Sequence, residues 1–146
     1  MPISDVMTWD VATCAAGDTV REAALKMKNE DCGLIPVLEK NESGSPIGVL
    51  TDRDITCRVV AGGRSPDEVV IRDVMSKSVI TIHYKAQLNA AMRLMEQHNL
   101  RRLIVTGDTG ELRGVISLTD LTRTIGREKL GEVIQKVSHQ RRPGMG

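Results

Sequence analysis

Two short stretches of the sequence place a hydroxyl three residues before an acid. Thr51 precedes Asp54 in the first stretch, and Ser117 precedes Asp120 in the second. Ser or Thr at a helix N-cap with an acid three residues later is typical of a capping box, which satisfies two backbone N–H groups. The same residues could bind a ligand, because a hydroxyl and first-turn N–H groups suit phosphate, and a carboxylate suits a ribose diol. The two residue pairs alone leave both interpretations open.

Both turns lie in the same sequence context. A glycine, Gly48 or Gly114, and two apolar residues precede each hydroxyl, and a helical pattern follows, over 55–60 and over 121–125. One such turn is weak evidence for a ligand site, since caps are common. Two copies in matched contexts require more explanation than two independent caps.

An internal repeat contains both turns. Asp5-Val6-Met7 recurs 68 residues later as Asp73-Val74-Met75, and the hydroxyl of the turn recurs after 66 residues, from Thr51 to Ser117. A fixed period of this kind predicts two units with the same fold. A unit of this size buries too little surface to be stable alone, so we expect the two halves to pack on each other.

Each copy has the element order β-α-β-β-α, which predicts a mixed α/β (α+β) fold. Apolar residues at helical spacing predict helices from Val20 to Met27 and from Leu88 to Met95. Pro36, in the expected middle strand of the first copy, predicts a sheet edge or a bulge, because proline has no N–H to donate. In chain order we expect strands at 11–14, 34–38, 79–82 and 103–105, hairpin turns at 41–46 and 106–110, and second helices at 55–60 and 121–125.

The repeat also sets the expected domain boundaries. We predict a first repeat at 1–62, a linker at 63–70 and a second repeat at 71–126. The remaining residues, 127–146, carry an amphipathic helical pattern followed by a basic tail. That helix could cover its own domain or dock on a partner, and the first interpretation is favoured.

Composition excludes several classes of protein. The chain has 146 residues, 40% of them hydrophobic and 27% charged, as a globular protein does. No apolar run is long enough to cross a bilayer, and the first residues lack the pattern of a signal peptide, so we expect a cytoplasmic protein without membrane contact. A net charge of +1 and only two aromatic residues, Trp9 and Tyr84, argue against nucleic-acid binding.

No catalytic constellation is present. The sequence has no phosphate-binding loop of the form Gly-x-x-x-x-Gly-Lys, no Gly-x-Gly-x-x-Gly fingerprint and no His-Glu-x-x-His. Cys14, Cys32 and Cys57 are odd in number and widely spaced, which indicates buried thiols more than a disulfide framework or a thiol or metal sensor. We therefore predict a protein that is not an enzyme, with no metal site and no required cofactor.

The paired units, the Asp-Val-Met openings and the two turns together resemble a tandem of cystathionine β-synthase (CBS) domains, or Bateman module, over roughly residues 3–126. The chain is similar to the small prokaryotic proteins that consist of one such pair. The resemblance implies repeats packed sheet to sheet with pseudo-twofold symmetry and clefts that bind an adenosyl ligand: AMP, ADP, ATP, S-adenosylmethionine or sometimes NAD. It also implies a regulatory role, a homodimer and a separate regulated protein.

The resemblance assigns roles to individual residues. Thr51 and Ser117 contact phosphate, and Asp54 and Asp120 hold the ribose hydroxyls. The middle strands line the clefts, and threonines of the first strands, with Lys85, lie near the base or the phosphate. The nucleotide-binding residues expected in this way are Thr13, Leu34, Ile35, Gly48, Thr51, Asp54, Thr81, Lys85, Arg101, Arg102, Leu103, Gly114, Ser117 and Asp120.

Charge distinguishes the two turns. Arg101 and Arg102 stand where the first copy has Gly33 and Leu34, and a guanidinium binds phosphate strongly. These arginines could serve either cleft or form surface ion pairs. Asp52, inside the first turn, repels phosphate unless Arg53 offsets its charge. We therefore predict that the second turn binds a nucleotide more strongly.

A second function class stays open. The turns could be helix caps only, in a structural or interaction module that contacts a protein or a nucleic acid through its C-terminal segment. Ligand-dependent thermal stability separates this alternative from the nucleotide-binding one.

Overall fold

The computed structural model describes residues 1–40, 44–124 and 134–137. The expected hairpin turn at 41–46 and the expected C-terminal helix lie partly outside the described residues, and the basic tail at 138–146 lies wholly outside them.

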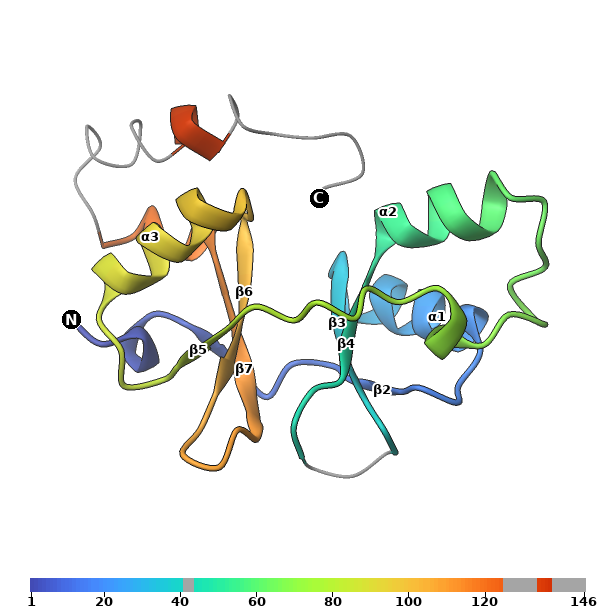
Figure 1. Ribbon diagram of the computed structural model, residues 1–146, viewed down its shortest axis with the longest axis horizontal. Helices are drawn as coiled ribbons and strands as arrows, with labels where there is room; N and C mark the ends of the chain where they lie inside the picture. Colours follow the sequence, from blue (N-terminus) through green and yellow to red (C-terminus); the bar gives the residue numbers. More distant parts are fainter. Residues whose placement is uncertain (41–43, 125–133, 138–146) are drawn as a thin grey trace. The chain divides into compact units, whose positions relative to one another are not determined.

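The chain forms two compact units, each built from a sheet and helices (Figure 1). Unit 1 comprises Met1–Asp10 and Ile80–Gly146, and unit 2 comprises Val11–Val79. Both are mixed α+β structures with the expected order of strands and helices, which confirms the predicted fold class.

Unit 2 holds most of the first repeat. Its strands pair in the order β2-β3-β4, with β2 parallel and β4 antiparallel to β3. Helix α1 begins at an N-cap, Thr19, whose side chain accepts a hydrogen bond from the Glu22 amide, and it ends at Asp31 in the left-handed conformation. The elements are β2 (Cys14–Ala15), α1 (Val20–Glu30), β3 (Leu34–Leu38), β4 (Gly48–Thr51), α2 (Asp52–Asp54), its continuation as the π-helix η2 (Ile55–Val60), and the 3-10 helix η3 (Ile71–Asp73).

Pro36 lies in the central strand of this sheet, and no bulge separates it from β4. The strand β2 pairs only with Val37 and Leu38, so β3 has no partner on that side at Pro36. The missing N–H therefore breaks no pairing on the β2 side. The expected sheet edge exists only locally, at the position before β2 begins.

Unit 1 holds most of the second repeat. Its strands pair in the order β1-β7-β6-β5. Residues 134–137 are helical, and Val137 is 2% exposed within the core of the unit, so this part of the C-terminal segment covers its own domain as favoured. The elements are the 3-10 helix η1 (Ile3–Asp5), β1 (Thr8–Trp9), β5 (Thr81–His83), α3 (Leu88–His98), β6 (Arg102–Thr106), β7 (Leu112–Ser117) and α4 (Leu118–Leu121).

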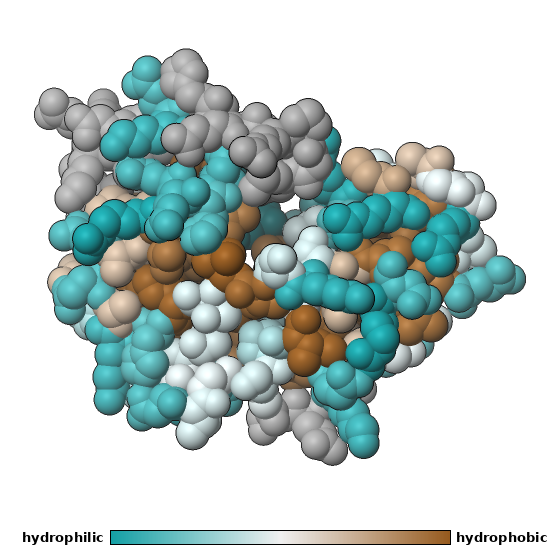
Figure 2. All heavy atoms as spheres, in the orientation of Figure 1, coloured by the Kyte–Doolittle hydropathy of each residue, from teal (hydrophilic) through white to brown (hydrophobic). Residues whose placement is uncertain are grey.

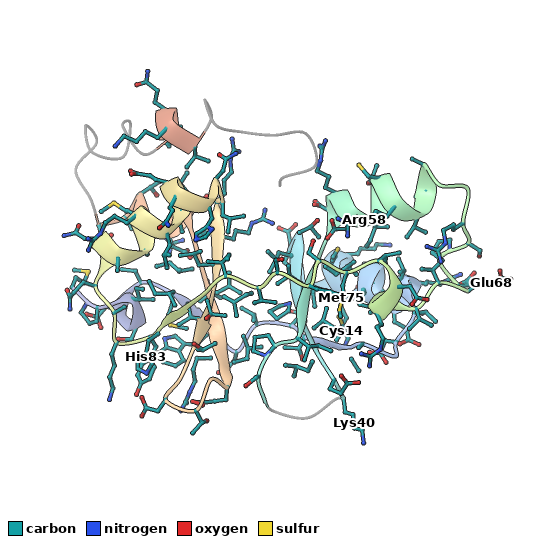
Figure 3. The ribbon with its side chains drawn as sticks, viewed as in Figure 1. Cys14, Lys40, Arg58, Glu68, Met75 and His83 are labelled. Atoms are coloured by element: carbon teal, nitrogen blue, oxygen red, sulfur yellow. The ribbon has the colours of Figure 1, made fainter. Side chains whose placement is uncertain are left out.

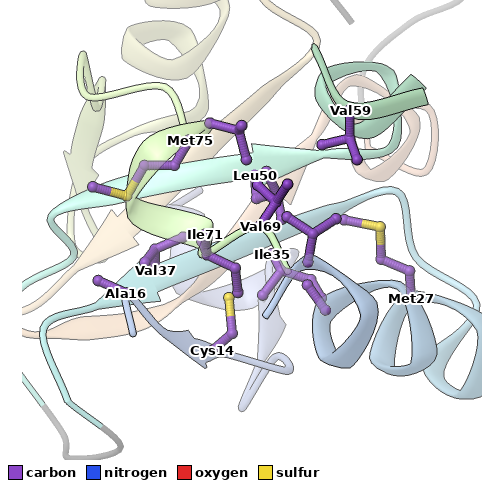
Figure 4. Close-up of a cluster of buried hydrophobic side chains, with 13 residues drawn as sticks. Cys14, Ala16, Met27, Ile35, Val37, Leu50, Val59, Val69, Ile71 and Met75 are labelled. Carbon is purple, nitrogen blue, oxygen red and sulfur yellow. The ribbon is translucent and has the colours of Figure 1, made fainter. Parts of the chain in front are cut away.

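Each unit takes its opening segment from the other repeat. Ile3, in the first repeat by sequence, is fully buried in the core of unit 1, and Ile71, in the second, is fully buried in the core of unit 2 (Figure 4). The two Asp-Val-Met openings are therefore exchanged. The compact units differ in this way from the domains predicted at 1–62 and 71–126, which kept each opening with its own repeat.

Both cores are aliphatic, as the scarcity of aromatic residues requires. In unit 2, α1 and η2 pack on one face of the sheet through Met27, Val59, Ile35 and Leu50 (Figure 4). On the face shown in Figure 2, hydrophilic residues cover most of the described surface and hydrophobic residues show mainly between them. None of the described helices is long and apolar enough to cross a membrane.

Several predicted boundaries were wrong by a few residues. The first strand of each copy starts later than expected, at Cys14 and at Thr81. The second helices start earlier, at Asp52 and at Leu118, because the capping residue is the last residue of the preceding strand. The hydroxyl of the turn thus belongs to both elements.

Candidate functional site

The two hydroxyl–acid turns form complete capping boxes. In unit 2 the Asp54 amide donates to Thr51 Oγ1 at 3.0 Å, and the Thr51 amide donates to Asp54 Oδ2 at 3.0 Å. In unit 1 the Asp120 amide donates to Ser117 Oγ at 3.1 Å, and the Ser117 amide donates to Asp120 Oδ2 at 2.9 Å. The capping interpretation is therefore correct for both copies.

Capping does not exhaust the chemistry of these side chains. A hydroxyl that accepts one hydrogen bond still has its own hydrogen to donate, so Thr51 and Ser117 keep a donor for a phosphate oxygen. Each carboxylate uses Oδ2 in the cap and keeps Oδ1. Asp54 and Asp120 are 6% and 9% exposed, and buried carboxylates form stronger interactions than exposed ones. Caps and ligand contacts are thus compatible in the same turn.

The first-turn backbone amides differ between the copies. In unit 2 the carboxylate of Asp52 accepts a hydrogen bond from the Arg53 amide at 2.8 Å. The corresponding amide in unit 1 belongs to Thr119, and its neighbour Leu118 has no side-chain acceptor to offer. Among the residues that the structure describes, none accepts from the Thr119 amide. One donor is therefore occupied in the first turn and available in the second.

The residue before the middle strand meets this turn through the backbone. The Asp52 amide donates to the carbonyl of Gly33 at 2.9 Å, and the Leu118 amide donates to the carbonyl of Arg101 at 2.7 Å. A Cβ atom on Gly33 would lie 2.9 Å from Asp52 Oδ2, so the acid occupies the space beside the glycine. Unit 1 has Arg101 in the position of this glycine and Leu118 in the position of the acid.

The middle strands place their side chains alternately. Leu34 lies opposite Thr51, and Arg102 lies opposite Ser117, all four partly exposed. The next residues point the other way. Their side chains, Ile35 and Leu103, are 0% and 1% exposed within the two hydrophobic cores, so only their backbone could take part in lining a cleft, which stays a prediction. Side chains one residue apart on a strand face opposite sides of the sheet.

Gly48 and Gly114 have a packing role. A Cβ atom on Gly48 would meet Met75 and the carbonyl of Ser76, and one on Gly114 would meet Met7 and the carbonyl of Thr8. Both glycines therefore accommodate the exchanged Asp-Val-Met openings, each three residues before the capping hydroxyl. This contact accounts for both glycines without a ligand.

The remaining predicted residues lie farther along the sheets. Lys85 follows β5, whose last residue pairs with Thr106, whereas Ser117 pairs with Arg102 at the other end of β6. Four residues of strand separate these levels by about 13 Å. Lys85 is exposed, with Nζ 5.5 Å from the centre of the Tyr84 ring. The structure thus does not bring Lys85 to the turn of its own unit.

Thr81 is the first residue of β5, and Thr13 immediately precedes β2. Thr81 is exposed on β5, two strands from Ser117, and the carbonyl of Thr13 accepts a hydrogen bond from Lys26 Nζ at 2.6 Å. Within each unit, the structure therefore gathers the hydroxyl, the acid, the first-turn amides and the start of the middle strand at one end of the sheet.

One charged residue at this end was missed by the sequence reasoning. Arg58, on η2, points back toward the turn, with Nη2 3.8 Å from Asp54 Oδ1 and Nη1 2.7 Å from the carbonyl oxygen of Val74 (Figure 3). The spacing of four residues between Asp54 and Arg58 is the signal that could have found it, because such residues are neighbours on a helix.

Thiol and metal chemistry find little support in the described part of the chain. Burial raises the pKa of the Cys14 thiol to about 12, which keeps it protonated and unreactive. No group of three or more His, Cys, Asp or Glu among the described residues has a geometry that could hold a metal ion.

Comparison with known proteins identifies the repeats. The family model described as "CBS domain" matches residues 3–60 and 71–127, which is most of the chain. The chain belongs to the CBS domain family. The two capping boxes are thus the corresponding turns of two CBS repeats.

Relatives of the CBS pair are found in bacteria and archaea. The CBS domain-containing protein YhcV of Bacillus subtilis is 37% identical over 94% of this chain and 96% of its own length. A Methanopyrus kandleri protein, MK0525, is 37% identical over 82% of this chain, which spans 60% of that protein. The CBS domain protein PAE2072 of Pyrobaculum aerophilum, solved in complex with AMP, is 26% identical, with a TM-score of 0.76 over 92% of this chain and 99% of its own.

Proposed function

We propose that this CBS pair is a regulatory module that binds an adenine nucleotide or another adenosyl ligand at its hydroxyl–acid turns and modulates a separate protein. The observation that carries the proposal is the pair of capping boxes, in which each hydroxyl keeps a hydrogen to donate and each buried carboxylate keeps Oδ1. The complex of PAE2072 with AMP supports this ligand class. AMP, ADP, ATP, S-adenosylmethionine and NAD remain the candidates.

The chemistry assigns one part of the ligand to each group. Thr51 and Ser117 donate to a phosphate oxygen through the hydrogen that capping leaves unused. Asp54 and Asp120 accept from the ribose hydroxyls, and a charged acceptor strengthens such bonds roughly twofold. In each turn the hydroxyl and the acid are bonded to each other's backbone amide, and we propose that they bind the ligand without transforming it.

We propose further that the turns are unequal and that the second binds phosphate more strongly. Its Thr119 amide has no acceptor among the described residues, whereas Asp52 occupies the corresponding donor of the first turn and adds a negative charge there. Arg101, beside Leu118, adds a positive charge at the second turn. At the second turn a phosphate therefore meets a free amide and no acid beside it, whereas at the first turn the negative charge of Asp52 opposes the positive charge of Arg58.

Thermal unfolding with the five candidate ligands tests the function. A ligand at 100 times its Kd adds about 2.7 kcal/mol to the free energy of unfolding, which raises the melting temperature of a chain of this size by several degrees. The double variant Asp54→Asn/Asp120→Asn keeps an acceptor for the cap and removes both charges. We expect it to lose the shift, and a variant at an exposed acid, Asp67→Asn, to keep it.

Calorimetry on the single variants tests the inequality. We expect Asp120→Asn to weaken nucleotide binding more than Asp54→Asn does. A larger loss from Asp54→Asn contradicts the order of the two turns, and the absence of any thermal shift with all five ligands contradicts nucleotide binding itself.

The rest of the proposed function rests on the resemblance to the family. We propose that the module acts as a homodimer in the cytoplasm and that it regulates a separate protein. The rival, a structural module whose turns are caps only, predicts no ligand-dependent shift and a salt-dependent partner contact that is lost when residues 138–146 are deleted.

A further inference from the structure

Arg58 contacts two parts of unit 2 that are far apart in the sequence. Its Nη1 donates to the carbonyl of Val74 at 2.7 Å, and its Nη2 lies 3.8 Å from Asp54 Oδ1 (Figure 3). Val74 belongs to the exchanged opening of the second repeat, and Asp54 is the acid of the first turn. One guanidinium therefore contacts both the proposed ribose acceptor and the exchanged segment.

The contact uses the oxygen that the capping box leaves unused. Oδ2 of Asp54 accepts from the Thr51 amide, so Oδ1 is the oxygen with capacity for a ribose hydroxyl. The Asp54 side chain is 7% exposed and the Arg58 side chain 49% exposed. The arginine can therefore move into solvent, whereas the carboxylate cannot.

Unit 1 offers a matched comparison without this contact. The residue that corresponds to Arg58 is Thr124, whose hydroxyl donates to the carbonyl of Leu121 at 3.4 Å. Among the described residues, no Lys or Arg forms an ion pair with Asp120. The turns are alike in their caps and differ in this cation.

The local helix geometry directs Arg58 toward the turn. Residues Ile55–Val60 form a π-helix, and the Ala61 amide bonds the carbonyl of Thr56, five residues earlier. Short π-helical segments are rare and frequently occur at functional sites.

We propose that Arg58 is a specificity-determining residue of the first turn. Its positive charge pairs with Asp54 Oδ1 and thereby disfavours a ligand that offers this oxygen only an uncharged ribose diol. Through its contact with Val74, Arg58 also transmits ligand binding to the exchanged segment. The proposal rests on the proposed function. A neutral adenosyl ligand at Asp54 displaces Arg58 from Oδ1 and brings no charge in return, so its binding is weakened. Displacement also removes the hydrogen-bond donor from the Val74 carbonyl. By linkage, holding the exchanged segment in its position against Arg58 lowers the affinity for the ligand by the same factor.

The test uses 5′-methylthioadenosine, an uncharged adenosyl probe, and calorimetry on the full chain with the second turn disabled by Asp120→Asn. In this background Arg58→Met is compared with Arg21→Met, which removes another exposed ion pair of unit 2, with Asp67. We expect Arg58→Met to bind the probe roughly two- to fivefold more tightly, the range for a partly exposed ion pair, and Arg21→Met to leave binding unchanged. Equal or weaker binding by Arg58→Met overturns the proposal.

Hydrogen exchange without ligand tests the second half of the contact. The Ser76 amide, which donates to the carbonyl of Val49 at 2.9 Å, reports on the exchanged segment. We expect it to exchange faster in Arg58→Met than in Arg21→Met. If no variant binds any adenosyl ligand, the proposed function fails, and hydrogen exchange alone tests the contact of Arg58 with the exchanged segment. Equal protection of the Ser76 amide in both variants overturns that contact.

Discussion

The carbonyl oxygen of Ser76 lies 2.9 Å from the point at which Gly48 would carry a Cβ atom. Val49, the next residue of β4, exchanges two backbone hydrogen bonds with Ser76, each 2.9 Å long. Gly114 and Thr8 have the corresponding arrangement in unit 1. A glycine at the start of each turn motif is therefore required by the segment that pairs beside it, which comes from the other repeat.

Replacement of Gly48 by alanine tests this requirement. We expect Gly48→Ala to lower the free energy of unfolding by about 1–3 kcal/mol, the usual cost of overpacking a filled site. The methyl group would meet Met75, which can move, and the backbone of Ser76, which can move only by breaking its bonds with Val49. Denaturant unfolding of the variant gives the number.

Gly17→Ala is the matched control, because a Cβ atom on Gly17 has no neighbour within 4 Å. We expect its free energy of unfolding to stay within about 0.5 kcal/mol of the wild-type value. Equal stability of Gly48→Ala and Gly17→Ala would show that the close approach of Ser76 is not a constraint.

The exchange of the openings predicts where a core mutation is felt. Ile71 belongs to the second repeat by sequence but is fully buried in the core of unit 2. We expect Ile71→Ala to cost about 2–5 kcal/mol, as large-to-small core substitutions do. Site-resolved hydrogen exchange should show the loss of protection in β3 and β4, which come from the first repeat. Loss confined to β5–β7 would contradict the exchange.

Sequence reasoning found the repeat and the capping pairs because both are local patterns. Thr51 with Asp54 and the stripe from Val20 to Met27 need only neighbours along the chain to be interpreted. The exchanged openings could not be predicted in this way. Nothing in the residues around Ile3 or Ile71 indicates which of two similar cores they enter.

The same limit applies at the site. Whether the side chain of Ile35 or that of Leu34 enters the core depends on the register of β3 with β4, and a shift by one residue reverses every side chain. Arg58 was missed because its second contact, the carbonyl of Val74, is a backbone atom 16 residues away that carries no signal in the sequence.

The caps should contribute to stability without any ligand. We expect Thr51→Ala to lower the free energy of unfolding by about 1 kcal/mol, since the Asp54 amide loses its acceptor. Thr51→Ser keeps that acceptor and should stay close to the wild type. Ligand titration of both variants then separates the two roles of the hydroxyl: a cap alone predicts equal thermal shifts, and a phosphate donor predicts a smaller shift for Thr51→Ala.

Cys14 predicts a pH dependence with a definite sign. Burial raises its pKa from 9.0 to about 12 in the folded state, so between these values the folded chain holds a proton that the unfolded chain has lost. Cys14 therefore contributes stability that is fully present below about pH 9 and is lost as the pH rises toward 12. Cys14→Ala should remove this part of the dependence of stability on pH, while the other titrating groups keep theirs. Unfolding curves of both proteins at several alkaline pH values measure the difference.

At neutral pH an alkylating reagent should modify Cys57, which is exposed, and leave Cys14 intact in the folded protein. Modification of Cys14 at the rate of Cys57 would contradict its burial.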